Sequence, residues 1–248
     1  MLTPRGDTER QAFLRDKSIK EVGDGANIYV TRILSVLIPQ SKLLDVGCGT
    51  AHIIKRLAKR CKNILFIGLD ISPAMMDMAR DNIQGLTNVE LVQGDGLELP
   101  FKGSEFDVVI NRLADYSLSG VYRILKRSGY FFEYGLGPDA DQEIKEFFPD
   151  RYEEENFFLP KDPVHWRKEV VEEVSKVGFD EVKIEDYRRK DHYRSKEEIM
   201  DLIEMVPLVK DFNREKDSLK VDDFIDRYRE RNGIGITWHF YILRAQKL

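Results

Sequence analysis

Residues 43–58 read LLDVGCGTAHIIKRLA, and this stretch decides the fold. It starts as an apolar run and continues as an amphipathic segment in which Ile53 and Leu57 are four residues apart, as on one face of a helix. Gly47 and Gly49 separate the two parts. Glycine permits a tight turn and lets a ligand approach the main chain, and the first turn of a helix offers unpaired N–H groups. The stretch therefore predicts a strand, a ligand-binding loop and a helix, in that order.

The same alternation continues to about residue 137. Strands are predicted over residues 42–46, 64–69, 89–93, 106–110 and 129–134, and helices over residues 51–60, 73–83 and 120–126. The strands are apolar on both faces and the helices between them are amphipathic, which is typical of a parallel sheet covered by helices on both sides. We therefore predict a doubly wound α/β unit over about residues 40–137.

The later part of the chain extends this unit and interrupts it twice. A further helix is predicted over residues 162–177, and further strands over residues 181–187 and 234–244. Residues 138–161 and 190–232 break the pattern, and insertions at the carboxyl edge of an open sheet usually carry the specificity. We predict an N-terminal helical segment over residues 1–40 and one domain over residues 41–248, in which the two helical insertions form a substrate cover.

The composition is that of an acidic globular protein. Of the 248 residues, 42% are hydrophobic and 33% are charged, and the formal net charge is −5, which disfavours general binding to nucleic acid. Basic residues gather at residues 188–194, which we interpret as a solvated strand end and turn. Cys48 and Cys61 have the spacing neither of a metal site nor of a disulfide framework, so we expect no metal and a cytoplasmic location. The charged amino terminus has no apolar core of a secretory signal, and no stretch approaches the ~20 apolar residues of a membrane span.

Acidic residues follow the next two strands. Asp70 ends the second predicted strand, where a carboxylate can accept hydrogen bonds from both hydroxyls of a ribose lying across the glycine loop. Asp95 follows the third strand and can accept from an exocyclic amine, and Gly96 leaves room for a flat ring. A nicotinamide site would require a third small residue where this chain has His52, whereas the spacing here places Ala51 in that role.

Four motifs together resemble those of a known family. LLDVGCGT, GLDISPAMMDMAR, VQGDGLELPF and FDVVI occur in the order and spacing of class I S-adenosylmethionine-dependent methyltransferases, and the style is similar to the ubiquinone/menaquinone-biosynthesis-like small-molecule group. The resemblance covers about residues 41–137. It implies a mostly parallel, seven-stranded, Rossmann-like sheet whose last strand is antiparallel, with residues 181–187 and 234–244 as the terminal hairpin.

The resemblance also implies the cofactor, S-adenosyl-L-methionine, and its contacts. Asp45, Gly47 and Gly49 would face the methionine part, Asp70 the ribose, Asp95 the adenine amine with Gly96 or Leu97 beside it, and Asn111 the surroundings of the sulfonium; Cys48, Ile71 and Met75 complete the expected set. No lysine of the Walker type follows the glycine loop, which disfavours hydrolysis of nucleoside triphosphates. This chain departs from the family pattern at residue 51, where it has alanine and the family more commonly has glycine.

Methyl transfer requires orientation above all, and a base only where the acceptor must lose a proton. Asp115 and Tyr116 follow the fourth strand and rank first as base candidates, and His192 is the third. Aromatic residues in the first insertion indicate either a greasy or aromatic acceptor or a helix that packs its own face; they are Phe147, Phe148, Tyr152, Phe157 and Phe158.

We therefore predict methyl transfer to an oxygen, nitrogen or carbon atom of a small molecule. An RNA methyltransferase is the nearest alternative, although residues 139–155 are acidic where RNA would need a basic cover. A nucleotide-binding oxidoreductase and a cofactor-binding module without catalysis remain as alternatives from other classes. We predict no membrane partner, and the sequence does not predict an oligomeric state.

Overall fold

The computed structural model describes residues 8–21, 26–152, 164–206 and 208–248. The chain divides into two compact units. The first unit comprises Met1–Gly135, His165–Glu185 and Tyr241–Leu248, and the second comprises Leu136–Val164 and Asp186–Phe240. Both predicted insertions fall in the second unit, and their role as a substrate cover stays a prediction. Residues 153–161 of the first insertion, with Phe157 and Phe158, and the start of the predicted helix 162–177 lie outside the described residues.

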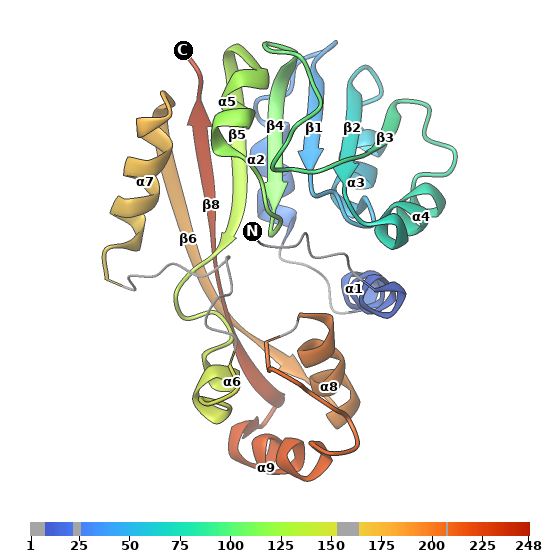
Figure 1. Ribbon diagram of the computed structural model, residues 1–248, viewed down its shortest axis with the longest axis vertical. Helices are drawn as coiled ribbons and strands as arrows, with labels where there is room; N and C mark the ends of the chain where they lie inside the picture. The colour runs from blue at the N-terminus through green and yellow to red at the C-terminus, as the bar shows by residue number, and fades with distance from the viewer. Residues whose placement is uncertain (1–7, 22–25, 153–163, 207) are drawn as a thin grey trace. The chain divides into compact units, whose positions relative to one another are not determined.

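One sheet contains the described strands. They are β1 (Lys42–Val46), β2 (Leu65–Asp70), β3 (Val89–Gln93), β4 (Phe106–Arg112), β5 (Leu125–Leu136), β6 (Asp180–Tyr193), β7 (Arg229–Glu230) and β8 (Gly233–Gln246). The order is β3-β2-β1-β4-β5-β8-β6, and the short β7 pairs with β8 off this path. The pairs from β3 to β5 are parallel, whereas β8 runs against β5 (Figure 1). The predicted fold class, a mostly parallel sheet with an antiparallel last strand, is confirmed.

The middle of the sheet is buried on both faces, as its continuous apolar strands predict. Leu43 and Leu44, on opposite faces of β1, are both fully buried. In the parallel register, Leu44 is aligned with Ile67 of β2 and with Val109 of β4. The carboxyl ends of these strands therefore meet at one edge, which is where the predicted site residues are placed.

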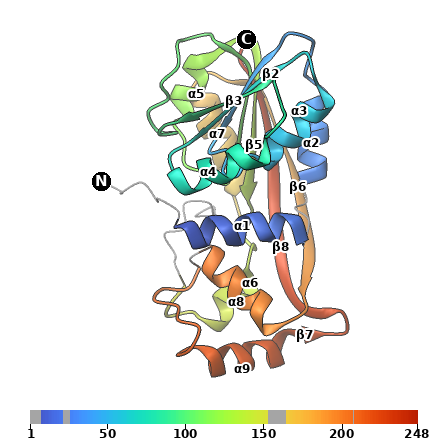
Figure 2. The ribbon, with the colours of Figure 1, turned by 90° about the vertical axis from the view of Figure 1, so that its right-hand side faces the viewer.

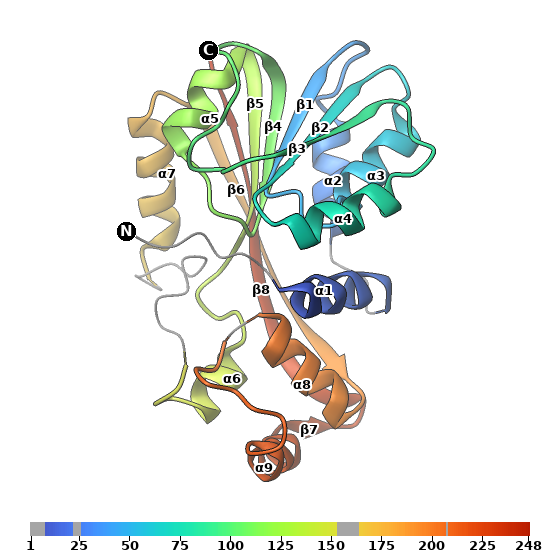
Figure 3. The ribbon, with the colours of Figure 1, turned by 45° about the vertical axis from the view of Figure 1, so that its right-hand side comes forward.

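Helices cover both faces of the sheet in the first unit (Figure 3). They are α2 (Ala26–Leu34), α3 (His52–Arg60), α4 (Pro73–Asn82), α5 (Leu118–Ile124) and α7 (Trp166–Lys176). On one face, Val121 of α5 and Trp166 of α7 join the core cluster that contains Leu44. On the other face, the buried Tyr29 of α2 donates its phenol hydrogen to main-chain oxygens of β4 and β5, 2.8 and 3.1 Å away.

The first helix, α1 (Glu9–Glu21), lies next to α4 (Figure 2). Side-chain contacts join it to the start of α3 and the end of α4. Asp16 lies 2.7 Å from Nε2 of His52, at the start of α3, and accepts a hydrogen bond of 2.9 Å from the Asn82 amide, at the end of α4. Asp16 and His52 are both largely buried, so this contact joins α1 to the end of the glycine loop away from solvent.

Several strands are longer than predicted, and β5 and β6 exceed their predicted bounds the most. β5 begins at Leu125, directly after α5. The polar residues after Leu125 are accommodated by a register shift, because Phe106 of β4 pairs with Leu125 whereas Val108 pairs with Tyr130. β6 continues to Tyr193, so the interpretation of residues 188–194 as a strand end and turn is wrong in its extent. Two of the basic residues there are paired with acids, Arg188 with Asp139 at 2.6 Å and Arg189 with Asp191 at 2.8 Å.

Among its described residues, the second unit contains the carboxyl end of β6, the amino end of β8, the short β7 and three helices. They are α6 (Gln142–Phe147), α8 (Lys196–Met205) and α9 (Ser218–Tyr228). The predicted cap of α8 is present, since Ser195 Oγ accepts a hydrogen bond from Glu198 N. A separate apolar cluster holds this unit together, with Ile144, Phe148, Ile199, Leu202, Phe224 and Ile236 among its members. None of the helices that the structure describes is long and apolar enough to cross a membrane.

Candidate cofactor site

The glycine loop, residues 47–51, turns sharply between β1 and α3. Gly47 and Gly49 have φ of +72° and +53°, in the region that glycine enters without steric cost. The N–H groups of Gly47 and Cys48 both donate to the Leu69 carbonyl, at 2.8 and 2.9 Å. A Cβ on Gly47 would lie 2.0 Å from Cβ of Ala114, so the missing side chain lets the loop after β4 approach.

Asp70 connects this loop to the end of β2. Its Oδ2 accepts a hydrogen bond of 2.8 Å from Gly49 N, and its Oδ1 accepts one of 2.9 Å from Ser72 N. Ser72 in turn caps α4 through Met75 N. Because each carboxylate oxygen has two acceptor positions, Asp70 holds both loops and still has capacity for ligand hydroxyls.

Asp45 lies buried at the end of β1, with only 2% of its surface exposed. Burial raises the pKa of its carboxyl, Arg112 acts to lower it and the charge of Asp70 to raise it, and the net pKa is about 8. Two acidic groups therefore lie close together where solvent screens them poorly. A cationic group bound beside them would lower the free energy of their ionised forms.

The loop after β3 places the next predicted residues. Oδ1 of Asp95 accepts from Leu97 N at 2.8 Å, which leaves Oδ2 for another donor, and Leu97 is half exposed. Gly96 has a structural role of its own, and the flat ring expected beside it stays a prediction. A Cβ there would lie 2.4 Å from the Asp115 carbonyl oxygen, so the glycine makes room for the loop of residues 113–117.

Asn111 is buried near the end of β4, where its side chain connects β1 to the loop after β4. Its amide nitrogen donates to the carbonyls of Val46 and Ala114, both at 3.0 Å. Both amide hydrogens therefore serve the protein itself, so the predicted contact near the sulfonium would have to come from the rest of the side chain.

The three base candidates have different surroundings. Asp115 is exposed in the loop of residues 113–117. Tyr116 donates its phenol hydrogen to Glu133 at 3.0 Å, and burial, with the Glu133 charge, raises the pKa of Tyr116 well above its usual value, which disfavours it as a base. His192 belongs to the second unit, where its Nε2 lies 3.0 Å from Glu230.

Glu133 is a residue that the sequence analysis missed. It lies on β5 and accepts hydrogen bonds from Tyr116 and, at 3.1 Å, from Tyr241. Burial raises the pKa of Glu133 to about 6, although the two phenols act to lower it. A single glutamate within the apolar run YFFEYGL was the available signal, because a charged residue in a buried strand needs partners.

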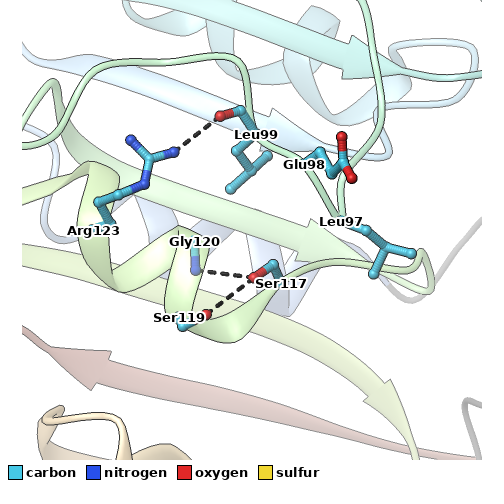
Figure 4. Close-up of a pocket in the computed structure, with 7 residues that line it drawn as sticks. All are labelled: Leu97, Glu98, Leu99, Ser117, Ser119, Gly120 and Arg123. Atoms are coloured by element: carbon cyan, nitrogen blue, oxygen red, sulfur yellow. Dashed lines mark hydrogen bonds between the residues drawn. The ribbon is translucent and has the colours of Figure 1, made fainter.

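A pocket of about 480 Å³ opens beside the predicted adenine residues (Figure 4). Its lining residues are Leu97, Glu98, Leu99, Ser117, Ser119, Gly120 and Arg123. Arg123 fixes one wall by donating to the carbonyls of Leu99 and Phe101 at 2.9 and 2.7 Å. The pocket thus shares Leu97 with the predicted cofactor contacts.

Comparison with known proteins identifies the part of the chain that carries this site. The model of the methyltransferase domain family matches residues 43–129. A probable ribosomal RNA small subunit methyltransferase A of Methanosarcina acetivorans is 33% identical over 136 residues, 53% of this chain and 44% of that protein. A demethylmenaquinone methyltransferase of Staphylococcus carnosus is 38% identical over 97 residues, 36% of this chain and 40% of that protein. The chain therefore spans less than half the length of these curated relatives.

A solved structure extends the likeness in fold to nearly the whole chain. The phosphoethanolamine N-methyltransferase 2 of Haemonchus contortus, in complex with S-adenosyl-L-methionine, superposes with a TM-score of 0.63. The match covers 97% of this chain and 57% of that one, at 18% sequence identity. The predicted resemblance to class I methyltransferases is thus confirmed for the domain and for the fold.

Proposed function

We propose that this chain is an S-adenosylmethionine-dependent methyltransferase that acts on a small-molecule acceptor, on the premise that residues 43–129 form a methyltransferase domain. The observation that carries the proposal is the pair of carboxylates, Asp45 and Asp70, beside a loop of bare main chain. The cofactor contains a cationic sulfonium and a cationic ammonium and no phosphate, so buried negative charge suits it where a phosphate would be repelled. When bound, it supplies a methyl group from a sulfonium that departs as a neutral thioether.

The residues of the first unit bind and orient this group. The remaining lone pairs of Asp70 accept from the ribose hydroxyls, and Oδ2 of Asp95 accepts from the adenine amine. Asp45 lies on the methionine side, where its charge favours the ammonium. The other expected contacts form the lining, at Gly47, Cys48, Gly49, Ile71, Met75, Gly96, Leu97 and Asn111.

Holding the acceptor in line with the methyl group supplies most of what the protein must do. Where the acceptor carries a proton, Asp115 is the base candidate that the first unit presents to solvent. Tyr116 donates a hydrogen bond to Glu133, so we assign it a positioning role and not the role of the base. His192 remains a candidate from the second unit.

Ribosomal RNA is the second candidate acceptor, favoured by the 33% identity to the Methanosarcina acetivorans protein. The net charge of −5 and the pairing of Arg188 and Arg189 with carboxylates support the small molecule over RNA. We place the reaction in the cytoplasm, in keeping with the two unpaired thiols, Cys48 and Cys61.

Cofactor binding is expected to release a proton from Asp45. Because the pKa of this carboxyl is about 8 in the ligand-free protein, most molecules carry the proton at neutral pH. A bound ammonium favours the carboxylate and lowers that pKa, so close to one proton should leave at about pH 7 and almost none above about pH 9. Titration calorimetry with S-adenosylhomocysteine, which carries the same ammonium, in phosphate and in Tris measures the number released.

The Asp45→Asn variant keeps the shape of the side chain and removes the titrating group, so it should bind more weakly and release no proton. Asp81→Asn, on the outer side of α4, is the matched control and should behave like the wild type. Equal proton release from the wild type and from Asp45→Asn would contradict the role of this carboxyl.

Methyl transfer itself separates the two acceptor classes. With labelled cofactor, we expect label in small molecules of an acceptor panel and none above background in small-subunit ribosomal RNA. Label in the RNA alone would replace the small-molecule assignment with the RNA one. Saturable cofactor binding without transfer to either class would favour the binding module.

A further inference from the structure

The loop of residues 113–117, between β4 and α5, lies against two glycines of the candidate cofactor site. A Cβ on Gly47 would lie 2.0 Å from Cβ of Ala114, and one on Gly96 would lie 2.4 Å from the Asp115 carbonyl oxygen. The loop therefore packs directly against the main chain at both glycines. Its position determines the shape of the site that we assign to the cofactor.

This loop begins in a strained conformation. Leu113 has φ of +54°, in the left-handed region that residues other than glycine seldom adopt. Its N–H donates to the Tyr134 carbonyl at 3.2 Å, which holds the first residue of the loop to β5. Strained backbone persists where the surrounding contacts determine it, so the rest of the loop requires anchors as well.

Main-chain carbonyls accept two hydrogen bonds that hold the middle and the end of the loop. The Asn111 amide donates to the Ala114 carbonyl, and Ser117 N donates to the Gly96 carbonyl, both at 3.0 Å. Hydrogen bonds between neutral groups such as these contribute modestly to stability. A loop that begins with a strained residue is therefore sensitive to any stronger contact that it makes.

Tyr116 makes such a contact, because its phenol donates to a carboxylate. The acceptor is Oε2 of Glu133 on β5, 3.0 Å away. The Tyr116 ring lies 5.4 Å from the ring of Phe131, on the same strand. Hydrogen bonds to charged groups are stronger than neutral ones, so this bond contributes more to the position of the loop than either carbonyl contact.

A second phenol fixes Glu133 itself. Its Oε1 accepts from the hydroxyl of Tyr241 at 3.1 Å, and the Tyr241 ring lies 5.1 Å from that of Trp166, which is buried. Each oxygen of the carboxylate thus accepts one phenol hydrogen. Glu133, Tyr116, Tyr241 and Trp166 all belong to the first unit.

The charge on Glu133 changes close to neutral pH, since its pKa is about 6. Burial raises this pKa, the phenols of Tyr116 and Tyr241 lower it, and the charge of Glu173 on α7 raises it. The charge of Glu133 also acts on the buried phenol of Tyr29, on α2. The phenols of Tyr116 and Tyr241 donate to the ionised form, so the carboxylate is the form that holds the loop.

We propose that Glu133 is a positioning residue of the cofactor site, which acts through Tyr116 to hold the strained loop of residues 113–117 against Gly47 and Gly96. The identity of the ligand rests on the proposed function, whereas the anchoring is a property of the ligand-free protein. Loss of the carboxylate or of the phenol releases the loop and weakens binding of the cofactor.

Hydrogen exchange of the ligand-free protein tests the anchoring by itself. In Tyr116→Phe, the Ser117 amide should exchange about 5-fold faster or more, because its opening no longer breaks the bond to the carboxylate. Tyr241→Phe leaves that bond in place and should accelerate the exchange less. Tyr130→Phe, a matched change elsewhere on β5, should leave it unchanged. Equal rates for Ser117 in Tyr116→Phe and Tyr130→Phe, or in Tyr116→Phe and Tyr241→Phe, would overturn the proposal.

Titration calorimetry with S-adenosylhomocysteine measures what the anchoring contributes to binding. The affinity should fall about 5-fold or more in Tyr116→Phe and in Glu133→Gln, with Tyr130→Phe within about 2-fold of the wild type. The double variant should bind about as Glu133→Gln does, because both changes break the same contact. Urea unfolding verifies that each variant is folded. Additive losses in the double variant would contradict a route through Tyr116.

The pH profile of the same titrations distinguishes positioning from a general effect on stability. The Kd of Glu133→Gln divided by that of the wild type should be about 5 or more above about pH 7 and approach 1 below about pH 5, where Glu133 takes up its proton. Asp45 titrates in both proteins, so its effect cancels in this ratio. A ratio that does not change with pH would overturn the positioning role.

The two kinds of measurement separate this proposal from the proposed function. Binding of S-adenosylhomocysteine to the wild type, with unchanged Ser117 exchange in folded Tyr116→Phe, would overturn the role of Glu133 alone. Faster exchange in Tyr116→Phe, in a chain whose wild type does not bind S-adenosylhomocysteine, would overturn the methyltransferase proposal and leave Glu133 as the anchor of the loop.

Discussion

Replacing Asp70 with alanine is expected to lower the affinity for S-adenosylmethionine about 100-fold or more. The carboxylate accepts hydrogen bonds from Gly49 N and Ser72 N, and we assign it the ribose hydroxyls as well. Hydrogen bonds to a charged group contribute about 1.5–3 kcal/mol each, so loss of two of them to the ligand costs about 3–6 kcal/mol. Titration calorimetry at one pH and salt concentration measures the change.

Asp77→Ala provides the matched control for Asp70→Ala. Asp77 is an exposed acid on α4 that is paired with Arg80, so its loss should leave the affinity within about 2-fold of the wild type. Asp70→Asn preserves the shape of the side chain and should fall between the two. If folded Asp70→Ala binds as tightly as Asp77→Ala, the carboxylate does not hold the ribose.

Replacing Gly47 with alanine is expected to destabilise the protein by about 2–5 kcal/mol. A left-handed conformation costs a residue other than glycine about 1–2 kcal/mol, and a Cβ only 2.0 Å from Cβ of Ala114 adds about 1–3 kcal/mol through overpacking. The glycine loop would have to move, so cofactor affinity should fall with stability. Urea unfolding monitored by circular dichroism measures the first effect.

Gly85 separates backbone strain from the steric overlap. It has φ of +82°, yet a Cβ there would meet nothing within 4 Å, so Gly85→Ala should cost about 1–2 kcal/mol. The double variant Gly47→Ala/Ala114→Gly removes the overlapping carbon and should recover part of the lost stability. Equal free energies of unfolding for Gly47→Ala and Gly85→Ala would contradict the steric argument.

The fold was predictable where the local pattern and the tertiary environment agree. β1 and β3 have the predicted bounds, Lys42–Val46 and Val89–Gln93, because both are short segments between clear turns. The extension of β6 to Tyr193 was not predictable, since the residues from Arg188 to His192 are charged and have no apolar alternation. The strand conformation of these residues depends on the pairing of β6 with β8 in the sheet. It also depends on acids that are distant in sequence, such as Asp139, which pairs with Arg188.

The residues of the site were predictable where they belong to a local sequence motif. The sequence placed Gly47, Gly49 and Asp70 at the edge where the structure brings them together. It could not predict that Gly96 accommodates the Asp115 carbonyl, because that contact depends on how two loops pack. The hydrogen bond from Tyr241 to Glu133 was not predictable either, because the two residues lie 108 positions apart in the sequence.

The central claim is that the glycine loop and its carboxylates form a site for an adenosyl sulfonium compound. Calorimetric titration of the wild-type chain with S-adenosylhomocysteine tests it most directly, with NADH as the comparison ligand. We expect one saturable site with a Kd of about 1–100 μM for the first ligand, equivalent to about 5–8 kcal/mol, and no measurable heat with the second. Saturable binding of NADH, or no binding of S-adenosylhomocysteine at about 1 mM, would contradict the claim.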